Sequence, residues 1–404
     1  MKEGWEYKRL EEICTPINGL WKGKKEPFVN VGVIRNANFK KDFTLDFSNI
    51  EYLDVEAKKF ASRKLEPGDL IVERSGGSEK QPVGRAVLFN QSEGDYSFSN
   101  FTSVIRINDR KQVSPIFLFK YLLYFYLKGE TRPMQNAAIG LHNLDFKRYL
   151  SIEVPVPPLS EQQRIVSYLD AAFAKINAVA KNAEDSLNEA KALFQSALTK
   201  MMEPKEGWEE KTLSMLGESK VGPFGSLLHK KDYIEGGIPI INPMHIVKGK
   251  ISPNHKFTVS IEKLNKDLSS YLMHTNDIVI GRRGEMGRCA IVKPSQNGFV
   301  CGTGSIFFRP KTSIVNPRFL LTALLSSKSK KEMEALAGGA TMLNLSSKSL
   351  SNLSIDIPSL QEQCAIVSTL DSLKSKVDQL QSNLSLTLTE CTALKQAILR
   401  QTFE

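Results

Sequence analysis

The 404-residue chain lacks the features that define several large classes of protein. Its five cysteines are odd in number and show no Cys-x-x-Cys spacing, which argues against a disulfide framework or a zinc site and fits a reducing cytoplasm. The longest apolar run, residues 117–127, is interrupted by Lys120 and is too short to span a bilayer. The first residues are charged and contain no apolar signal segment. We therefore expect a cytoplasmic protein without a membrane anchor.

Motifs of enzymes that act on nucleotides and nucleic acids are also missing. No G-x-x-x-x-G-K-[S/T] P-loop is present, so ATP hydrolysis is not expected in this chain. An adenine methyltransferase would need an Asn/Asp-Pro-Pro-aromatic loop. The nearest match, Asn242-Pro243-Met244-His245, lacks the second proline and the aromatic residue. We predict a protein without catalytic residues, cofactor or metal of its own.

What the chain does contain is an internal duplication. The segment from Glu3 to Leu10 returns from Glu206 to Leu213 with six of eight residues identical. The segment from Leu159 to Asp170 returns from Leu360 to Asp371 with eight of twelve identical. A period of about 200 residues is far longer than the ~20–50 residues of solenoid repeats, so the repeated unit is a whole domain with a helix.

The positive charge of the chain lies in two of its four segments. Residues 1–150 carry 24 Lys and Arg against 19 Asp and Glu, and residues 204–359 carry 21 against 13. Residues 151–203 and 360–404 are slightly acidic. Two basic globular segments favour a polyanionic partner, most simply nucleic acid, although a solvated basic surface would show the same balance.

Two segments have the heptad spacing of long coiled-coil helices. The seam of the first contains Val166, Leu169, Phe173, Ile176, Ala180, Ala183, Leu187, Ala190, Phe194, Ala197 and Met201. The seam of the second contains Ile366, Leu370, Leu373, Val377, Leu380, Leu384, Thr387, Cys391, Leu394 and Ile398. Possible capping boxes precede them, at Ser160 with Gln163 and at Ser359 with Glu362. We predict that the two helices pack antiparallel within one chain; pairing of each with another chain is the alternative.

These features together resemble a known family. The run Val154-Pro155-Val156-Pro157-Pro158-Leu159-Ser160-Glu161-Gln162 resembles the central conserved region of type I restriction-modification specificity subunits. The run Ile355-Asp356-Ile357-Pro358-Ser359-Leu360-Gln361-Glu362-Gln363 resembles their distal conserved region, with one proline where the family usually has two. The resemblance covers essentially the whole chain.

The resemblance implies a division of labour among segments. Residues 1–158 and 204–358 would be two target recognition domains that each read one half of a bipartite DNA site. Residues 159–203 and 359–404 would be the helices that set the gap between the halves and dock two methyltransferase subunits. S-adenosylmethionine would bind those subunits, while ATP and magnesium would serve restriction and translocase subunits. The alternative is a two-headed scaffold that binds proteins.

For the two globular segments, the sequence predicts a mixed α/β fold. We expect strands at 28–34, 69–73 and 103–107 and helices near 115–128 and 317–330. DNA-contacting side chains are expected in loops rich in glycine, arginine, lysine and asparagine, because Arg and Lys pair with guanine and Asn with adenine. In residues 1–158 the predicted contacts are Lys22, Lys24, Lys25, Arg35, Asn36, Arg74, Ser75, Lys80, Arg85 and His142. In residues 204–358 they are Lys230, Lys231, Asn242, His245, Arg282, Arg283, Arg288 and Asn344.

Overall fold

The computed structural model describes residues 1–404 except 1–4, 21–22, 80, 139–140, 225–226 and 339–342. It divides into two compact units, Met1–Asp185 with Ser382–Glu404, and Ser186–Gln381. Each unit holds one globular head and parts of two long helices, α5 (Leu159–Met201) and α11 (Leu360–Phe403). We call residues 1–158 the first head and residues 204–358 the second head. The four-part division itself stays a prediction, although the bounds of both helices lie within two residues of it.

The first head combines many short strands with few helices. Its strands are β1 (Glu6–Arg9), β2 (Cys14–Asn18), β3 (Phe28–Ile34), β4 (Glu51–Glu56), β5 (Leu70–Glu73), β6 (Ser75–Gly77), β7 (Ala86–Leu88), β8 (Tyr96–Phe98), β9 (Thr102–Ile107), β10 (Gln135–Ala138), β11 (Leu141–Leu144) and β12 (Glu153–Val156). Its helices and 3-10 turns are α1 (Leu10–Ile13), η1 (Asn36–Asn38), α2 (Ala57–Ala61), α3 (Pro115–Lys128), η2 (Arg132–Met134) and α4 (Phe146–Leu150).

The second head has a similar order of elements. Its strands are β13 (Glu209–Thr212), β14 (Gly217–Val221), β15 (Ile238–Ile241), β16 (Ile246–Val247), β17 (Lys250–Ile251), β18 (Thr258–Val259), β19 (Ile278–Gly281), β20 (Cys289–Ile291), β21 (Val300–Cys301), β22 (Ser305–Pro310) and β23 (Ser354–Ile357). Its helices and helical turns are α6 (Leu213–Leu216), η3 (Lys230–Asp232), η4 (Pro243–His245), α7 (Ile261–Lys263), η5 (Leu264–Leu268), η6 (Ser269–Tyr271), η7 (Pro294–Gln296), α8 (Pro317–Leu324), α9 (Ser327–Leu336) and α10 (Ser347–Ser351).

Strand pairing shows that the two heads share one topology. The first head has a four-stranded antiparallel sheet, β2-β9-β5-β7, and the second has its counterpart, β14-β22-β19-β20. A three-stranded sheet follows in each, β4-β3-β8 and β18-β15-β21, with its one parallel pair in the same place. A two-stranded pair closes each head, β1-β12 and β13-β23. The duplication read in the sequence is therefore a duplication of the fold, and the mixed α/β prediction is confirmed.

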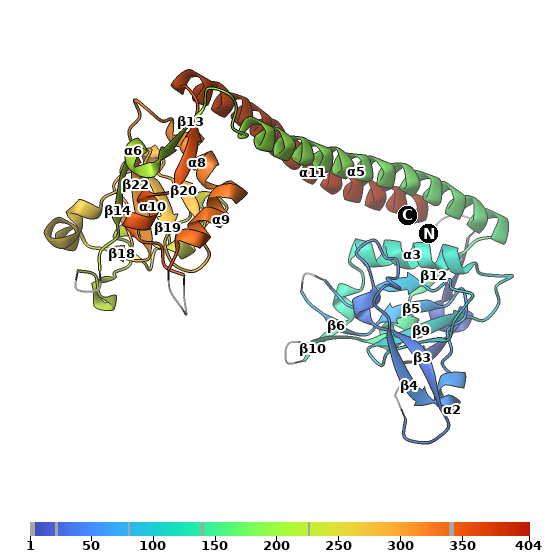
Figure 1. Cartoon of the computed structure of the whole chain (residues 1–404). Helices are drawn as coiled ribbons and strands as arrows, with labels where there is room; N and C mark the ends of the chain where they lie inside the picture. The colour runs from blue at the N-terminus through green and yellow to red at the C-terminus, as the bar shows by residue number, and fades with distance from the viewer. Residues whose placement is uncertain (1–4, 21–22, 80, 139–140, 225–226, 339–342) are drawn as a thin grey trace. The chain divides into compact units, whose positions relative to one another are not determined.

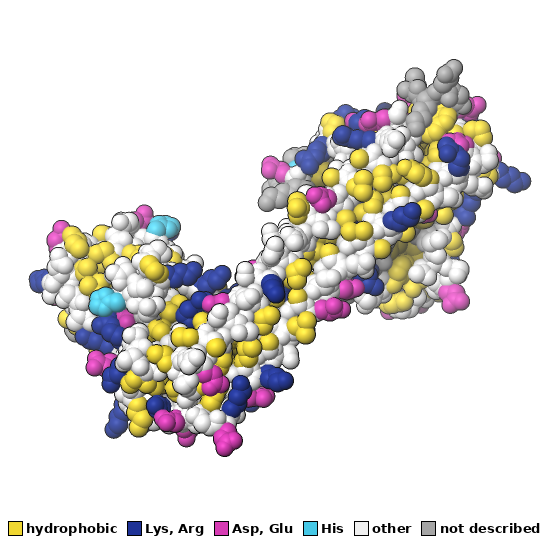
Figure 2. Space-filling view, turned by 90° about the horizontal axis from the view of Figure 1, so that it is seen from above, with side chains coloured by type: hydrophobic (Ala, Val, Ile, Leu, Met, Phe, Trp, Pro, Cys, Tyr) yellow, Lys and Arg dark blue, Asp and Glu magenta, His cyan; other side chains and the backbone are white. Residues whose placement is uncertain are grey.

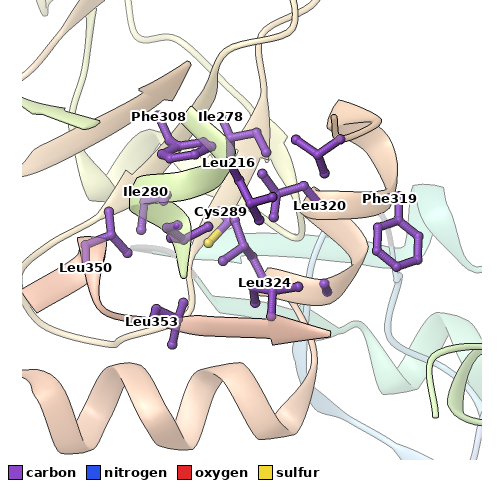
Figure 3. Close-up of a cluster of buried hydrophobic side chains, with 14 of the residues drawn as sticks. Leu216, Ile278, Ile280, Cys289, Phe308, Phe319, Leu320, Leu324, Leu350 and Leu353 are labelled. Atoms are coloured by element: carbon purple, nitrogen blue, oxygen red, sulfur yellow. The ribbon is translucent and has the colours of Figure 1, made fainter. Parts of the chain in front are cut away.

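Hydrophobic residues on both faces of the four-stranded sheet explain why its central strands are apolar throughout. In β19, Ile278 and Ile280 face the core under α8, and Val279 faces the opposite side. Strand β5 is buried in the same alternating way. Successive strand residues point to opposite faces, so a strand covered on both sides needs a continuous apolar run. Figure 3 shows the core under α8, where Leu320 and Leu324 lie beside Ile280 and Cys289.

The helix expected near 317–330 is wrong in its extent. Helix α8 ends at Leu324 and α9 begins at Ser327. The side chain of Ser326 accepts a hydrogen bond from the backbone N–H of Ser329 at 3.2 Å, so it caps a new helix where the old one was expected to continue. By contrast, α3 spans the expected residues 115–128 and ends at Gly129 in a left-handed conformation.

The long helices pack antiparallel inside each unit. In the first unit, Ile165 and Leu169 near the start of α5 pack with Leu399 and Phe403 near the end of α11. In the second unit, the end of α5 packs with the start of α11 around Leu370. Figure 1 shows the two helices side by side. The prediction of an antiparallel pair within one chain is confirmed.

Burial along the helices follows the predicted seams with two exceptions. Every seam residue of α5 is buried or partly buried. In α11, however, Leu380 and Leu394 are 37% and 51% exposed, because they lie at the edge of the buried stripe. The capping boxes are met only in part. Helix α5 already begins at Leu159, so Ser160 lies inside it, whereas Ser359 accepts a hydrogen bond from the N–H of Glu362 at 3.3 Å.

A buried glutamine fastens each head to its helix. Gln162, fully buried, accepts a hydrogen bond from the N–H of Ser114 and donates to the carbonyls of Gln112 and Pro157, all at 2.8 Å. Ser114 is the N-cap residue of α3, so the side chain links the start of α5 to the start of α3. Gln363 is the equivalent of Gln162 in the second unit. It accepts a hydrogen bond from the N–H of Asn316 and donates to the carbonyls of Ile314 and Pro358.

Candidate nucleic-acid interface

The glycine-bracketed arginines follow the same central strand in both heads. Arg74 comes directly after β5 and Arg282 directly after β19. Two residues further on, Gly76 and Gly284 have φ of 103° and 78°, a left-handed conformation that glycine adopts without strain. In the first head Gly76 lies inside the short strand β6, and in the second Gly284 lies in a bend, so each arginine stands directly at the end of the central strand.

Both arginines are held by polar and aromatic neighbours. Arg74 is half-buried, donates to the side-chain oxygen of Asn18 at 3.1 Å and lies 4.6 Å from the ring centre of Phe146. Arg282 is only 5% exposed, and its Nε donates to Oδ1 of Asn344 at 3.1 Å. Burial lowers the pKa of both guanidinium groups.

An unmade hydrogen bond distinguishes Arg282. Within the described part of the chain, its buried Nη1 has no hydrogen-bond partner. A buried charged donor without an acceptor is costly, by about 1–3 kcal/mol or more. The guanidinium of Arg282 is thus held beside the loop with part of its hydrogen-bonding capacity unused.

A duplicated asparagine lies beside each arginine loop. The N–H of Leu144 donates to the carbonyl of Arg74 at 2.7 Å, and the N–H of Leu345 donates to that of Arg282 at 2.8 Å. This places Asn143 opposite Ser75 in one head and Asn344 opposite Arg283 in the other. Asn143 was not among the predicted contacts, although its repetition was visible in the sequence.

In the first head these bonds join distant segments into one surface. The side-chain amide of Asn36 donates to the carbonyl of Ser75, whose hydroxyl donates to Oδ1 of Asn143. His142, half-buried, lies next along β11 and pairs with Gly77 of β6. We call Asn36, Arg74, Ser75, His142 and Asn143 the first-head cluster.

The second head builds its cluster from the equivalent segments. Oδ1 of Asn242 accepts from the N–H of Gly304 at 3.4 Å, and the carbonyl of Gly304 accepts from the N–H of Arg282 at 3.0 Å. Arg288 reaches the carbonyl of Pro243 at 3.5 Å. We call Asn242, Arg282, Arg283, Arg288 and Asn344 the second-head cluster. Arg283 is exposed, and Asn344 is exposed beside it.

The second arginine of each loop behaves differently in the two heads. Arg85 is 7% exposed, and its Nε lies 3.1 Å from Oε2 of Glu73, an ion pair inside the first head. Burial raises the pKa of Glu73, with Arg85 opposing the shift. The position equivalent to Glu73 is Gly281, so Arg288 instead pairs with Glu285 in a more exposed place. This geometry favours an internal role for Arg85.

His245 has a structural counterpart that explains its burial. Its Nδ1 accepts a hydrogen bond from the N–H of Asn242 at 3.2 Å, and it is 3% exposed. In the first head, Oδ1 of Asn38 accepts a hydrogen bond from the N–H of Arg35 in the same way, at 2.9 Å. Burial lowers the pKa of His245, which favours the neutral ring. The shared arrangement indicates that His245 caps the 3-10 turn η4, as Asn38 caps η1 in the first head.

The remaining predicted contacts are not members of the two clusters, or they lie outside the description. Arg35 is half-exposed and pairs with Glu51. Four lysines are exposed, Lys24 and Lys25 before β3 and Lys230 and Lys231 in η3. Lys22 and Lys80 lie outside the described residues. No prediction of a DNA contact is tested by these placements, and all of them stay predictions.

The described residues contain no group of three or more His, Cys, Asp or Glu side chains arranged to hold a metal ion. In the same part of the chain, no helix combines the length and apolarity needed to cross a bilayer. What the two heads share is a pair of polar, arginine-containing loop clusters, suited to hydrogen-bonding with a phosphate or a base.

Comparison with known proteins agrees with this reading. The chain is similar to the StySPI specificity subunit of Salmonella potsdam, a type I restriction enzyme, at 21% identity over 100% of this chain and 89% of that one. It is similar at 21% identity, with the same coverage, to the EcoKI specificity subunit of Escherichia coli, also of a type I restriction enzyme.

Solved structures share the fold. The HsdS subunit from Thermoanaerobacter tengcongensis matches with a TM-score of 0.61 and 20% identity, over 100% of this chain and 97% of that one. A chain from a study of the assembly and conformational transition of the type I R-M system matches with a TM-score of 0.76 and 20% identity, over 100% and 98%. The model of the type I restriction modification DNA specificity domain matches twice, over residues 2–189 and 205–390. The chain therefore belongs to the type I restriction-modification DNA specificity family.

Proposed function

We propose that this chain is the DNA-reading subunit of a type I restriction-modification complex, with each head recognising one half of a bipartite site. The observation that carries the proposal is the double match to the specificity-domain family, one match for each head. Two reading domains in one chain suit a site with two separate halves, since half-site spacing follows from protein geometry.

The clusters support different readings by the two heads. At equivalent positions after the central strand, the first head has Ser75 and the second has Arg283. Arginine pairs with guanine through two hydrogen bonds, whereas serine is less selective. The same framework with different side chains at its tip is therefore suited to two different half-sites. Basic residues elsewhere on the heads would bind phosphates and make the affinity dependent on salt.

The long helices support the docking of partner subunits. Apolar side chains on them remain exposed, with Val179 at 55%, Leu193 at 70% and Leu386 at 59%. Hydrophobic side chains are visible along the helices in Figure 2. Exposed apolar surface of this kind is typical of an interaction site. In our proposal two methyltransferase subunits bind here and the helices set the gap between the half-sites.

The chemistry in this proposal belongs to the partners. This chain would be a non-catalytic component, while S-adenosylmethionine is bound by the methyltransferase subunits and ATP and magnesium are used by restriction and translocase subunits. Such a complex acts on DNA in the cytoplasm, where we place the chain.

The proposal is tested by mapping adenine methylation in cells that co-express this chain with its methyltransferase subunit. Long-read sequencing should reveal one motif with two short defined halves and a fixed gap. Absence of methylation, together with absence of salt-sensitive binding to DNA by the purified complex, would refute the DNA-reading role.

The spacer role has its own test. Residues 177–183 of α5 and 384–390 of α11 form one heptad on each helix, next to the contact in which Cys391 lies 3.7 Å from the carbonyl of Ile176. Deleting both heptads should shorten the gap in the methylated motif and leave both halves unchanged. An unchanged gap in a still active complex would contradict the spacer role.

A further inference from the structure

The first head contains a cavity of about 400 Å³ that opens beside the first-head cluster. Its floor is apolar and comes from β3 and β4, through Val33, Leu53 and Val55. One wall is the turn from Ser99 to Phe101, between β8 and β9. Arg35 and Asn36 complete the lining on the side of the cluster, together with Leu20 and Ala37. Cavities of this size hold small organic ligands.

Three residues that line the cavity carry polar atoms without partners. Three lining residues have a buried side-chain atom with no hydrogen-bond partner within the described residues, namely Nε of Arg35, Oδ1 of Asn36 and Oγ of Ser99. Ser99 is only 8% exposed. Buried donors and acceptors are normally paired, so three unpaired atoms on residues that line one cavity leave hydrogen-bonding capacity that small side-chain movements would offer to a ligand.

An aromatic side chain gives the cavity a stacking surface. Phe101, which lines the cavity, is 47% exposed. Its carbonyl accepts hydrogen bonds from the N–H groups of Arg74 at 2.9 Å and Ser75 at 3.2 Å. The turn that carries the ring is thus attached directly to the first-head cluster. A ligand in the cavity would lie within reach of any DNA held by that cluster.

The second head is built differently at the same place. Gly302 is the counterpart of Ser99, since each N–H donates at 2.9 Å to the last residue of the equivalent strand, Ile241 or Ile34. A Cβ on Gly302 would lie 2.3 Å from Oδ1 of Asn242. The amide of Asn242 therefore occupies the space that the side chain of Ser99 has in the first head. The hydroxyl of Ser99 therefore has no equivalent at this position of the second head.

We propose that this cavity binds one base of the target DNA, turned out of the duplex. The proposal rests on the DNA-reading function proposed above. A planar base fits between an apolar floor and the ring of Phe101, and its edge would meet Arg35, Asn36 and Ser99. Stacking on an aromatic ring and completed hydrogen bonds offset the cost of leaving the duplex.

The test uses the purified full chain and duplexes that carry the mapped target. In a series of duplexes, the base opposite each position of the half-site is removed in turn, so that extrusion at that position no longer breaks a base pair. Binding is measured by fluorescence anisotropy at one salt concentration. When the base opposite one particular position is missing, the wild-type chain should bind that duplex about tenfold more tightly than it binds the intact duplex.

Two substitutions of the stacking residue and one control complete the test. Phe101→Ala and Phe101→Leu should both remove the tenfold gain, while their thermal unfolding shows that the head remains folded. Tyr52→Ala is the control, because Tyr52 is 57% exposed on β4 and alternates away from Leu53 and Val55. The Tyr52→Ala variant should retain the tenfold gain in affinity.

The outcomes separate the two proposals. A gain at no position, or a gain that persists in both Phe101 variants, would overturn the base-binding cavity while leaving the DNA-reading function intact. Equal binding of the intact target and a scrambled duplex would instead overturn the DNA-reading function.

Discussion

The buried glutamine at the junction of head and helix should be among the residues that stabilise this chain most. Replacing Gln162 by leucine keeps a similar volume but removes the acceptor of the Ser114 N–H and the donor to two carbonyls, each now bonded at 2.8 Å. An unpaired buried polar group costs about 1–3 kcal/mol, and relaxation recovers part of it. We expect Gln162→Leu to lower the free energy of unfolding of the first unit by about 2–5 kcal/mol.

The neighbouring residue provides a matched control. Gln163 is exposed on the same turn of α5, so Gln163→Leu should change the free energy of unfolding by less than about 0.5 kcal/mol. Calorimetry should show the melting temperature of Gln162→Leu lowered by roughly 5–15 °C. Hydrogen exchange should localise the loss to the start of α3, since the two units need not unfold together. Equal melting temperatures for the two variants would refute the reasoning.

Two other predictions follow from positions shared by the heads. A Cβ at Gly19 would lie 2.1 Å from the carbonyl oxygen of Ser99, and a Cβ at Gly222 would lie 2.0 Å from that of Gly302. Either glycine-to-alanine change should therefore cost about 2 kcal/mol or more in urea unfolding, whereas Gly338→Ala, whose Cβ would meet none of the described atoms within 4 Å, should cost little. Because burial lowers the pKa of His245, its stabilising contribution is present above the unfolded pKa of about 6.5 and is lost as the pH falls below it. Unfolding of the second unit between pH 7.5 and 5.5 should show this loss, and His245→Asn, which copies the residue of the first head, should reduce it; an unchanged pH dependence would contradict the buried neutral ring.

Periodicity explains which parts of the fold could be predicted from the sequence. The strand at 28–34, the helix at 115–128 and both long helices follow from hydrophobic spacing, which depends only on nearby residues. The break between α8 and α9 depends on one serine that accepts a local hydrogen bond, and nothing in the apolar pattern required it. Hydrophobic spacing therefore predicted the presence of helices and strands more reliably than the residues at which they begin and end.

The environment of individual side chains could not be predicted in the same way. Arg85 and Arg288 follow similar glycine loops, yet one is buried against Glu73 and the other pairs with Glu285, because Gly281 replaces the glutamate. No pattern in the sequence indicated that Phe101 lines a candidate binding site. Its importance comes from segments that meet only in the fold, which hydrophobic spacing does not report.

The most direct test of the account is to give the chain two copies of one head. Residues 206–359 are replaced by residues 3–158, the matching segment of the duplication, and adenine methylation is mapped with the same methyltransferase subunit. If each head reads its own half-site, the motif should become two copies of one wild-type half in inverted orientation, with the gap unchanged. An asymmetric motif that retains both original halves would contradict the central claim.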